Sequence, residues 1–580
     1  KNVDEPMEVF ALANEGFPTP KREEMEGKLK ATANGNGAKS GSWKRWVWAA
    51  GIAVAALAGL FFFLKNSFGG QNAPVPGAEK TIALLPFRNE SADKEQTQYF
   101  CNGVMESILN HLSQIGELHV ISRQSIERYR GSDKPAAEIA GELGVAYLLE
   151  GSIQRAGERV KINVQLIHAA ADRHLWAQEF AGDLNDIFAL QSAIAIAVAD
   201  ALQTTLSPEL KSRFERVPTT NLEAWDAYQQ AQALFGRFGY KSVEYWVQDD
   251  PAYFKALSLC DQALALDPGL AEAWTLKAQA WWQRNYWREM FQKDFMDSAA
   301  VFARQALKLD PNSAMAHALL GSYFYETGQT GKGLEYLEKA LALNPNQIES
   351  RIIAGRIYSD IGELEMAYQE LIIALNLAPN SAWAPDILSL LGLVYGNAAD
   401  LDKNEYYLNK AGTVSNEARP ALYVNTFWLN VLRGDLDKAS REAEKLRKID
   451  SVAYQPVICL FYNFRKEYEK SIASFEHLDK TAPHVVGPDL RHRWGQALWE
   501  TGQKEKAKVM FKQAEEGLLQ YVKKGRRRQI SAYYDLAGLH ACQGNIDQAL
   551  HYLRKFDEQG KWLFGIPYLI QVDPLFDNLR

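Results

Sequence analysis

The sequence is poor in cysteine, which limits both redox and zinc chemistry. Its 580 residues include four cysteines, each more than 80 residues from the next, and no Cys-x-x-Cys pair. A zinc ribbon and a thioredoxin-like redox motif each need such a pair, so neither is supported. We expect the cysteines to be buried as small apolar side chains, with long-range disulfides as the alternative. They are Cys101, Cys260, Cys459 and Cys542.

Catalytic signatures and excess positive charge are also missing. The sequence has no Gly-rich phosphate loop, no His-Glu-x-x-His and no nucleophile elbow. Its net charge of −7 gives no electrostatic reason to expect nucleic acid. We therefore expect no catalytic residue, no cofactor, no metal and no nucleic-acid partner in this chain.

The histidines do not change that expectation. His168 and His174 flank a predicted turn and could face each other across a hairpin, but no third metal ligand stands nearby in the sequence. His484 and His492 lie beside arginines where a loop is expected to enter a helix. We expect all four to be solvated surface residues.

One long apolar run divides the chain. Residues 46–64, WVWAAGIAVAALAGLFFFL, carry no charge, and a helix of that length covers roughly 29 Å, close to the hydrocarbon thickness of a bilayer. A buried core helix and a signal-peptide core are the alternatives, but a core helix would show a polar stripe and a signal peptide a shorter core near a cleavage site. We predict a single transmembrane helix.

Basic residues around this run predict its orientation. The twenty residues before it hold five Lys or Arg, and the twenty after it hold two, Lys65 and Lys80. The positive-inside rule then places the N-terminal side in the cytoplasm and residues 65–580 outside it, in the periplasm of a bacterium. Residues 17–45 and 65–79 have the polar, Gly- and Ala-rich composition of flexible linkers.

Residues 80–206 alternate between short apolar runs and helical periodicity, which predicts a small α/β domain. Gly157 and residues 169–172 interrupt the later runs and predict two hairpins. The expected strands are 82–87, 118–122, 146–154, 159–167 and 173–180, and the expected helices are 95–112, 123–130, 136–143 and 183–206.

This block resembles the TolB amino-terminal-like (FlgO-like) domain. The resemblance implies a binding or sensing module with no known chemistry. It rests on the run IALLPF with Asn89, on Phe100, Gly103, Ile108, Leu112, Ser122 and Arg123, on the stretch from Ala140 to Ile153, and on Val160, Ile162, Gln165, Leu166, Trp176, Phe188 and Gln191.

Residues 218–560 repeat. Pro311, Pro345 and Pro379 end successive helices at intervals of 34 residues, the tetratricopeptide period. Small residues recur where two helices would approach closely, as at Gly321 and Gly355. We expect an all-α solenoid of about nine repeats, closed by a C-terminal cap over 561–580 that resembles the ends of such arrays.

The first residues complete a larger resemblance. Residues 1–16 alternate as a strand would and resemble the closing strand of the class III adenylate/guanylate cyclase domain, through Lys1, Asn2, Val3, Asp4 and Pro6. The order of cyclase end, linker, span, TolB-like domain and repeats resembles bacterial membrane-bound cyclases. The resemblance implies a cytoplasmic, dimeric, divalent-metal (magnesium) cyclase, whose catalytic residues would lie upstream of this chain. A non-enzymatic envelope scaffold and a membrane-bound transcription regulator remain the alternatives.

Two surface features are candidates for partner binding. Residues 235–295 are rich in aromatic side chains, which could line a concave groove for a protein or peptide or simply pack an enlarged helix pair. The basic run from Lys523 to Arg528 could hold an acidic partner or anionic lipid, or be a solvated connection. The candidate partner-binding residues are Trp246, Trp281, Trp282, Tyr286 and Trp287.

The predicted topology is testable. In intact cells with a permeabilised outer envelope, added protease should digest the repeat array, because we place residues 65–580 outside the cytoplasm. Immunoblotting against a tag after residue 580 measures this. A cytoplasmic marker protein must stay intact in the same cells. An array that survives until the inner membrane is lysed would contradict the prediction.

Overall fold

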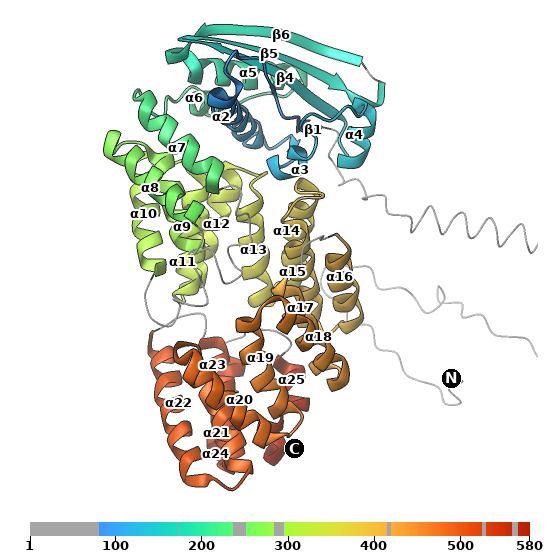
Figure 1. The fold of residues 1–580 in the computed structure, drawn as a ribbon, viewed down its shortest axis with the longest axis vertical. Coiled ribbons are helices and arrows are strands. Elements are labelled where there is room, and N and C mark those ends of the chain that lie inside the picture. The colour runs from blue at the N-terminus through green and yellow to red at the C-terminus, as the bar shows by residue number, and fades with distance from the viewer. Residues whose placement is uncertain are drawn as a thin grey trace, which may run out of the picture. The chain divides into compact units, whose positions relative to one another are not determined.

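A mixed sheet with two long helices across one of its faces begins the described part of the chain (Figure 1). The computed structural model describes residues 80–235, except Asp172, and then 251–283, 295–414, 419–524, 529–558 and 566–580. The sheet has six strands in the order β3-β1-β4-β5-β6, and the short β2 pairs with β4. The strands are β1 (Thr81–Leu84), β2 (Arg88–Asn89), β3 (His119–Val120), β4 (Tyr147–Ala156), β5 (Arg159–His168) and β6 (Arg173–Asp183).

The direction of each strand follows from its connection. β1 runs parallel to β3 and β4, and such pairs need crossover segments, which the helices between them supply. β4, β5 and β6 are antiparallel and need only short turns, one of them at Gly157 with a φ of 61°. Both predicted hairpins are thus confirmed. The helices of this domain are α2 (Lys94–Ser113), α3 (Arg123–Glu127), α4 (Ala136–Leu143), α5 (Ile187–Ala201) and α6 (Pro208–Phe214).

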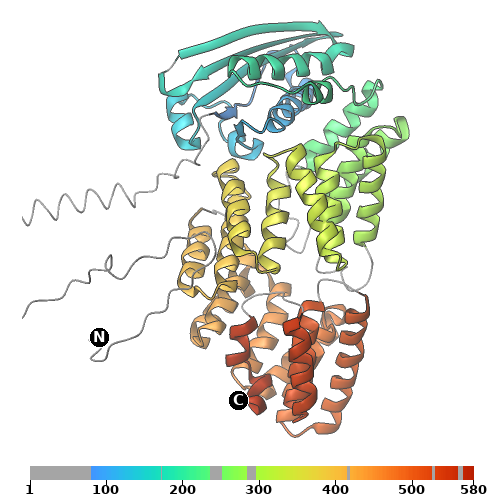
Figure 2. The ribbon, with the colours of Figure 1, turned by 180° about the vertical axis from the view of Figure 1, so that it is seen from behind.

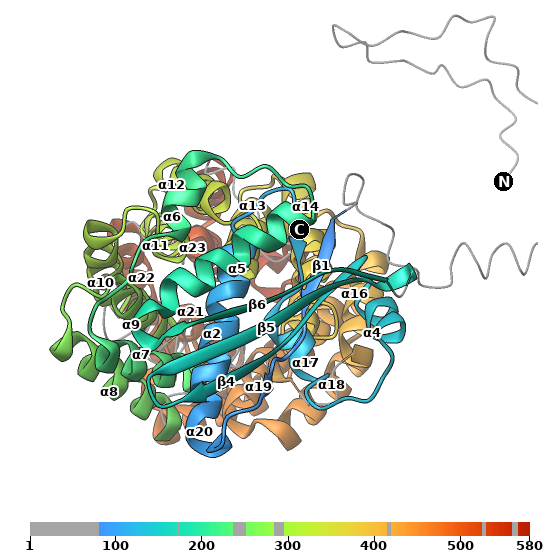
Figure 3. The same cartoon turned by 90° about the horizontal axis from the view of Figure 1, so that it is seen from above.

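Seen from the outer face of the sheet, α2 crosses behind the strands and α5 runs alongside β6 (Figure 3). Within the described residues, one segment is long and apolar enough to cross a membrane, Leu184–Ala201, which contains α5. Half of it is buried, and Ile194 and Val198 are fully enclosed in the core of the domain. We conclude that α5 is a core helix. The predicted span, 46–64, lies outside the described residues, as do the predicted cyclase tail and both linkers.

Helix α5 ends earlier than the pattern predicts. The helix was expected to reach residue 206, but α5 stops at Ala201. Gln203 adopts a positive φ of 53°, and the backbone N–H of Thr204 turns back to the carbonyl of Ala199. The remaining apolar residues belong to the turn that leads to α6.

Beyond α6 the described helices from Leu222 to Glu558 form nine consecutive pairs (Figures 1 and 2). This agrees with the predicted solenoid of about nine repeats. The pairs are α7 (Leu222–Phe235) with α8 (Pro251–Leu266), α9 (Ala271–Gln283) with α10 (Phe295–Leu309), α11 (Ala314–Glu326) with α12 (Thr330–Leu343), α13 (Ile348–Asp360) with α14 (Leu364–Leu377), α15 (Ala384–Asn397) with α16 (Leu401–Val414), α17 (Pro420–Leu432) with α18 (Leu436–Ile449), α19 (Ser451–Phe464) with α20 (Tyr468–Thr481), α21 (Pro488–Glu500) with α22 (Lys504–Lys524), and α23 (Gln529–Cys542) with α24 (Ile546–Glu558).

The small residues of the repeat pattern lie where paired helices touch. A Cβ atom at Gly321 would come within 2.8 Å of the Leu337 Cγ and 2.9 Å of the Gly333 carbonyl oxygen. At Gly355, one period later, it would come within 2.6 Å of the Leu371 Cγ. Both distances are shorter than van der Waals contact, so the close helix approach requires glycine. All four cysteines are free and buried, as expected.

The C-terminal residues close the last repeat through a buried ion pair. Both guanidinium Nη atoms of Arg493 donate to Asp573 at 2.6 Å, and the Tyr534 hydroxyl donates to the same carboxylate at 2.8 Å. Burial alone would raise the pKa of Asp573, but the charge and hydrogen bonds of Arg493 hold it below its ordinary value. Leu575 and Phe576 then fill the core. The C-terminal residues of the chain form α25 (Ile566–Val572) and a 3₁₀ helix (Pro574–Leu579).

One expectation about this region is wrong. His492 was expected on the surface, beside solvated arginines, but its side chain and that of Arg493 are buried. Burial lowers the pKa of His492 to about 3 and keeps the ring neutral. The charge of Arg493 is compensated by Asp573, 80 residues away in sequence, and such a partner is invisible to local pattern analysis.

A buried asparagine makes several of the hydrogen bonds between the sheet domain and the solenoid. The Nδ2 of Asn346, in the turn between α12 and α13, donates to the carbonyls of Ser113 and Leu118, both at 2.9 Å. Its Oδ1 accepts the backbone N–H of Val120 at 3.3 Å. Asn346 is 7% exposed, so these bonds lie out of competition with water. Residues 74–580 accordingly form one compact unit.

Replacing this asparagine should loosen the junction. Asn346→Ala leaves two carbonyls and one N–H of the sheet domain without their partner, which we expect to lower the free energy of unfolding by about 2–4 kcal/mol. Urea denaturation followed by tryptophan fluorescence measures it. Asn380 is the matched control, because it lies one 34-residue period later and makes a single exposed contact of 3.5 Å to the sheet domain. The control substitution is Asn380→Gly, because Asn380 has a φ of 57° that alanine would strain. Equal losses from Asn380→Gly would contradict the assignment.

Candidate ligand-binding site

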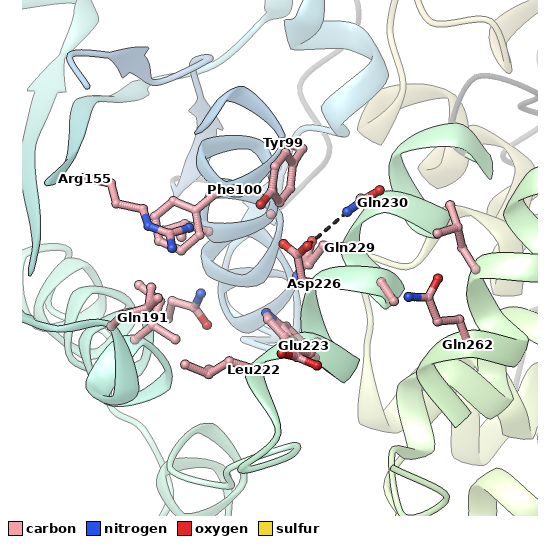
Figure 4. A pocket seen from close by; sticks show the side chains of 17 residues that line it. Tyr99, Phe100, Arg155, Gln191, Leu222, Glu223, Asp226, Gln229, Gln230 and Gln262 are labelled. Carbon is pink, nitrogen blue, oxygen red and sulfur yellow. Dashed lines mark hydrogen bonds between the residues drawn. The ribbon is translucent and has the colours of Figure 1, made fainter. Parts of the chain in front are cut away.

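A cavity of about 450 Å³ lies between the sheet domain and the first helix pair (Figure 4). Ligand sites in proteins commonly have volumes of about 300–1,000 Å³, so this one is large enough for a small molecule. Its walls come from α2, β4 and the start of α5 on one side and from α7 and α8 on the other. The lining residues are Tyr99, Phe100, Gly103, Val104, Arg155, Leu184, Ile187, Gln191, Leu222, Glu223, Trp225, Asp226, Ala227, Gln229, Gln230, Leu259 and Gln262.

The two walls approach closely because of a glycine and an aromatic pair. A Cβ atom at Gly103 would meet the Oε1 of Gln229 at 2.3 Å, so the side-chain amide of Gln229 on α7 lies directly against α2 at this glycine. The Trp225 ring meets Phe188 edge to face, with centroids 4.9 Å apart, and joins α7 to α5.

Opposite charges face the cavity from its two walls. The guanidinium of Arg155, near the end of β4, lies 5.2 Å from the centre of the Phe100 ring, and its Nε donates to the Gly157 carbonyl at 3.2 Å. Across the cavity, Asp226 on α7 accepts a hydrogen bond of 3.0 Å from Gln230. An arginine and a carboxylate can each bind a ligand group of opposite charge.

Tyr99 lies between these two charges. Burial and then its hydrogen bond to Asp226 raise the pKa of Tyr99, while the interaction with Arg155 lowers it by a smaller amount. The net pKa is above the ordinary value, so the hydroxyl keeps its proton at neutral pH and serves as a hydrogen-bond donor.

Gln191 has a buried side-chain amide whose N–H groups make no hydrogen bond within the described residues. Its side chain is 2% exposed, and its Nε2 has no hydrogen-bond partner within the described residues. A buried amide donor left unpaired costs roughly 1–3 kcal/mol. A ligand that presents an acceptor to Gln191 would recover that cost.

The lining consists of groups that can bind a ligand. Among the residues that the structure describes, no cluster of three or more His, Cys, Asp or Glu is placed to hold a metal ion. The cavity lining contains no cysteine, serine or histidine that would form a nucleophile–base pair. Its chemistry is that of amides, aromatic rings and separated charges.

The structure describes two of the five aromatic residues that were predicted to bind a partner. Trp281 and Trp282 lie at the end of α9, where Trp281 packs on Phe302 with ring centroids 6.0 Å apart and Trp282 joins the same core. Neither residue lines the cavity. Their contacts fit the packing alternative. Trp246, Tyr286 and Trp287 lie outside the described residues.

The other candidate groups are also separate from the cavity. In the β5–β6 register His174 is opposite Ile167, and His168 is opposite Arg173, so the two histidines are not cross-strand partners. Lys523 lies in the last turn of α22, and Arg526, Arg527 and Arg528 fall outside the described residues.

Sequence reasoning did not predict this cavity. Gly103 and Gln191 were noticed as part of the TolB-like pattern, and both turn out to shape it. Asp226 and Gln230 belong to the repeats, however, and nothing local indicates that they face Arg155. A buried, polar, helical residue such as Gln191 was the available signal, because an amide in a helix core needs a partner.

Comparisons with known proteins add two family matches. Residues 78–197 match the model for the second domain of HilA/YgeH-like transcriptional regulators, and residues 287–348 match a tetratricopeptide repeat model. The chain therefore contains tetratricopeptide repeats. The likeness of residues 80–206 to TolB stays a prediction.

A protein named putative adenylate cyclase 3, from Rhizobium meliloti (strain 1021), is similar to part of the chain. The two are 35% identical over 196 residues, which is 34% of this chain and 32% of that protein. The chain thus covers about a third of the length of this curated relative.

Solved structures of other repeat proteins align with parts of the chain at low similarity. PilW, described as a type IV pilus biogenesis factor, is 20% identical with a TM-score of 0.31, over 39% of this chain and 94% of PilW. PilF of Pseudomonas aeruginosa is 19% identical with a TM-score of 0.29, over 38% of this chain and 96% of PilF.

The partly buried His111 predicts a pH-dependent stability. The backbone of Gln191 forms a hydrogen bond with His111, whose ring stacks on Phe214 at 4.7 Å, and burial lowers the pKa of His111 to about 4. The unfolded chain protonates this ring below its ordinary pKa, near 6.5. Its contribution to stability is therefore complete above pH 6.5 and is lost as the pH falls towards 4, by at most about 1.4 kcal/mol per pH unit.

The comparison of two variants measures this effect. His111→Phe keeps a ring beside Phe214 and should reduce the slope of the unfolding free energy between pH 6.5 and 4. A slope from His492, whose pKa is also lowered, remains. His174→Gln, at an exposed position, should leave the profile unchanged. A profile that is as steep in His111→Phe as in the unaltered chain would show that this histidine is not responsible.

Proposed function

We propose that this chain is the protein-binding, regulatory region of a membrane-anchored signalling protein that controls a class III adenylate/guanylate cyclase. The observation that carries the proposal is the 35% identity, over 196 residues, to a protein named putative adenylate cyclase 3. The cyclase-like pattern in residues 1–16 supports the same assignment. Catalysis would belong to a domain upstream of Lys1 and would require a divalent metal, expected to be magnesium.

The repeats supply the binding function. Nine helix pairs present one continuous surface, and tetratricopeptide arrays bind proteins and peptides on the inner face of the superhelix. We place a protein or peptide partner on that concave face. The sheet domain, held to the array by Asn346, would move with it.

Signal passage across the membrane would need a second copy of the chain. A single helix transmits a signal only through a change in association, rotation or tilt against a partner helix. The predicted span, 46–64, is rich in alanine and glycine, including Gly51 and Gly59, which permits close helix packing. We therefore propose a homodimer with its N-terminal side in the cytoplasm and residues 65–580 in the periplasm.

A membrane-bound transcription regulator is the second candidate. It is favoured by the match of residues 78–197 to the second domain of HilA/YgeH-like transcriptional regulators. The pattern of residues 1–16 is unlike the end of a winged-helix domain, which would carry a basic helix and a hairpin wing. A third candidate, an envelope scaffold without enzymatic output, needs only the repeats.

Cyclic nucleotide production separates these candidates. The natural protein that contains this chain, expressed in bacteria lacking their own adenylate cyclase, should raise cyclic AMP or cyclic GMP. Deletion of residues 218–560 should change that output at equal protein level, because the array is the proposed regulatory input. Mass spectrometry of cell extracts measures both nucleotides.

The matched control is Asn380→Gly. Asn380 belongs to the array and makes one exposed contact to the sheet domain, and glycine tolerates its φ of 57°, so this variant should leave the output unchanged. A protein that is present in the membrane but yields neither nucleotide would exclude the cyclase assignment. Specific retardation of its own promoter DNA would then establish the regulator instead.

A further inference from the structure

The cavity between the sheet domain and the first helix pair has the charge arrangement of a receptor for a zwitterion. One cation, Arg155, faces it from the sheet domain, and one carboxylate, Asp226, faces it from α7 (Figure 4). The Tyr99 hydroxyl group lines the same cavity as these two charges (Figure 4). A ligand with a carboxylate at one end and an ammonium at the other would neutralise both.

The uncharged polar groups of the cavity are mostly amides. Four glutamines line it, one of them the buried Gln191 with its unpaired Nε2. A glutamine amide offers one acceptor and two N–H donors, which complement the N–H and C=O of a peptide group. The peptide carbonyl is the acceptor that Gln191 lacks.

Other ligand classes fit the lining less well. A phosphorylated ligand would meet a single cation and two carboxylates, Asp226 and Glu223, so its charge would be poorly compensated. A lipid chain would leave the amides and charges without partners. The apolar part of the lining is small, with Val104, Ile187 and Leu222 among its members, and suits a side chain rather than an acyl chain.

We infer that this cavity binds a short peptide of two or three residues, with its carboxylate on Arg155, its ammonium on Asp226 and a peptide carbonyl on Gln191. The cavity volume of about 450 Å³ accommodates such a molecule. The bound peptide would contact both walls and so strengthen the junction between the sheet domain and the first repeat. Binding itself does not depend on the proposed cyclase role, although it would name the stimulus.

Binding of defined dipeptides tests the inference. The 580-residue chain in lipid nanodiscs is dialysed against a pool of L-dipeptides, and retained species are identified by mass spectrometry. Isothermal titration with the best dipeptide should give one site per chain. N-acetylation or C-terminal amidation of that dipeptide should each weaken binding by roughly tenfold or more, because each removes one charged end.

Two variants assign the ends of the ligand. Arg155→Gln should weaken the free dipeptide by roughly tenfold or more but leave the amidated form unchanged, because that form has lost the charge that Arg155 binds. Asp226→Asn should likewise weaken the free dipeptide by roughly tenfold or more. It should leave the acetylated form unchanged, because that form has lost the ammonium that Asp226 binds. Arg159→Gln is the control, since Arg159 lies just across the β4–β5 turn with an exposed ion pair to Asp183. Circular dichroism melting confirms that each variant is folded.

Several results would overturn the inference. They are the retention of no dipeptide at millimolar concentration, binding that is indifferent to blocking of both ends, or equal losses from Arg155→Gln and Arg159→Gln. Binding of glucose or N-acetylglucosamine at the same site in place of dipeptides would also refute it. A cyclase assay that fails while dipeptides bind as described would count against the proposed function alone.

Discussion

The junction at Asn346 is the interaction on which the rest of the structure depends. One buried amide satisfies three backbone groups at the end of α2 and around β3, and it does so from a turn between two repeats. Without it, the end of α2 and the edge strand β3 would leave polar backbone groups buried and unpaired. The cavity lies where the sheet domain packs against the first helix pair of the same array.

A second buried polar interaction closes the other end of the array. A solenoid exposes an apolar face at each terminus unless something covers it. At the N-terminal end of the array the sheet domain provides the cover, through the Trp225–Phe188 contact. At the C-terminal end, Leu575 and Phe576 fill the last core, held in place by Asp573 on Arg493. The apolar face at one end of the array is thus covered by a folded domain, and the face at the other end by a short C-terminal segment.

Much of the fold could be predicted from sequence because its signals are local. The alternation of strands β4 to β6 and the Gly157 turn were predicted from a few neighbouring residues, and so was the glycine slot at Gly321. The candidate site could not be predicted in this way. Arg155 and Asp226 lie 71 residues apart in different domains. Of the aromatic residues predicted instead, the structure describes Trp281 and Trp282, and Trp281 packs on Phe302.

By itself the sequence determined the period of the repeats, the number of helix pairs and the alternation of the sheet, since each depends on the spacing of apolar and small residues along one segment. Only the tertiary structure decided which polar residues are buried and what they face. Asn346 and Asn380 occupy the same place in successive repeats, yet one is a buried link and the other an exposed contact. The difference arises because the sheet domain covers the turn at Asn346, and such a long-range contact leaves no trace in local spacing.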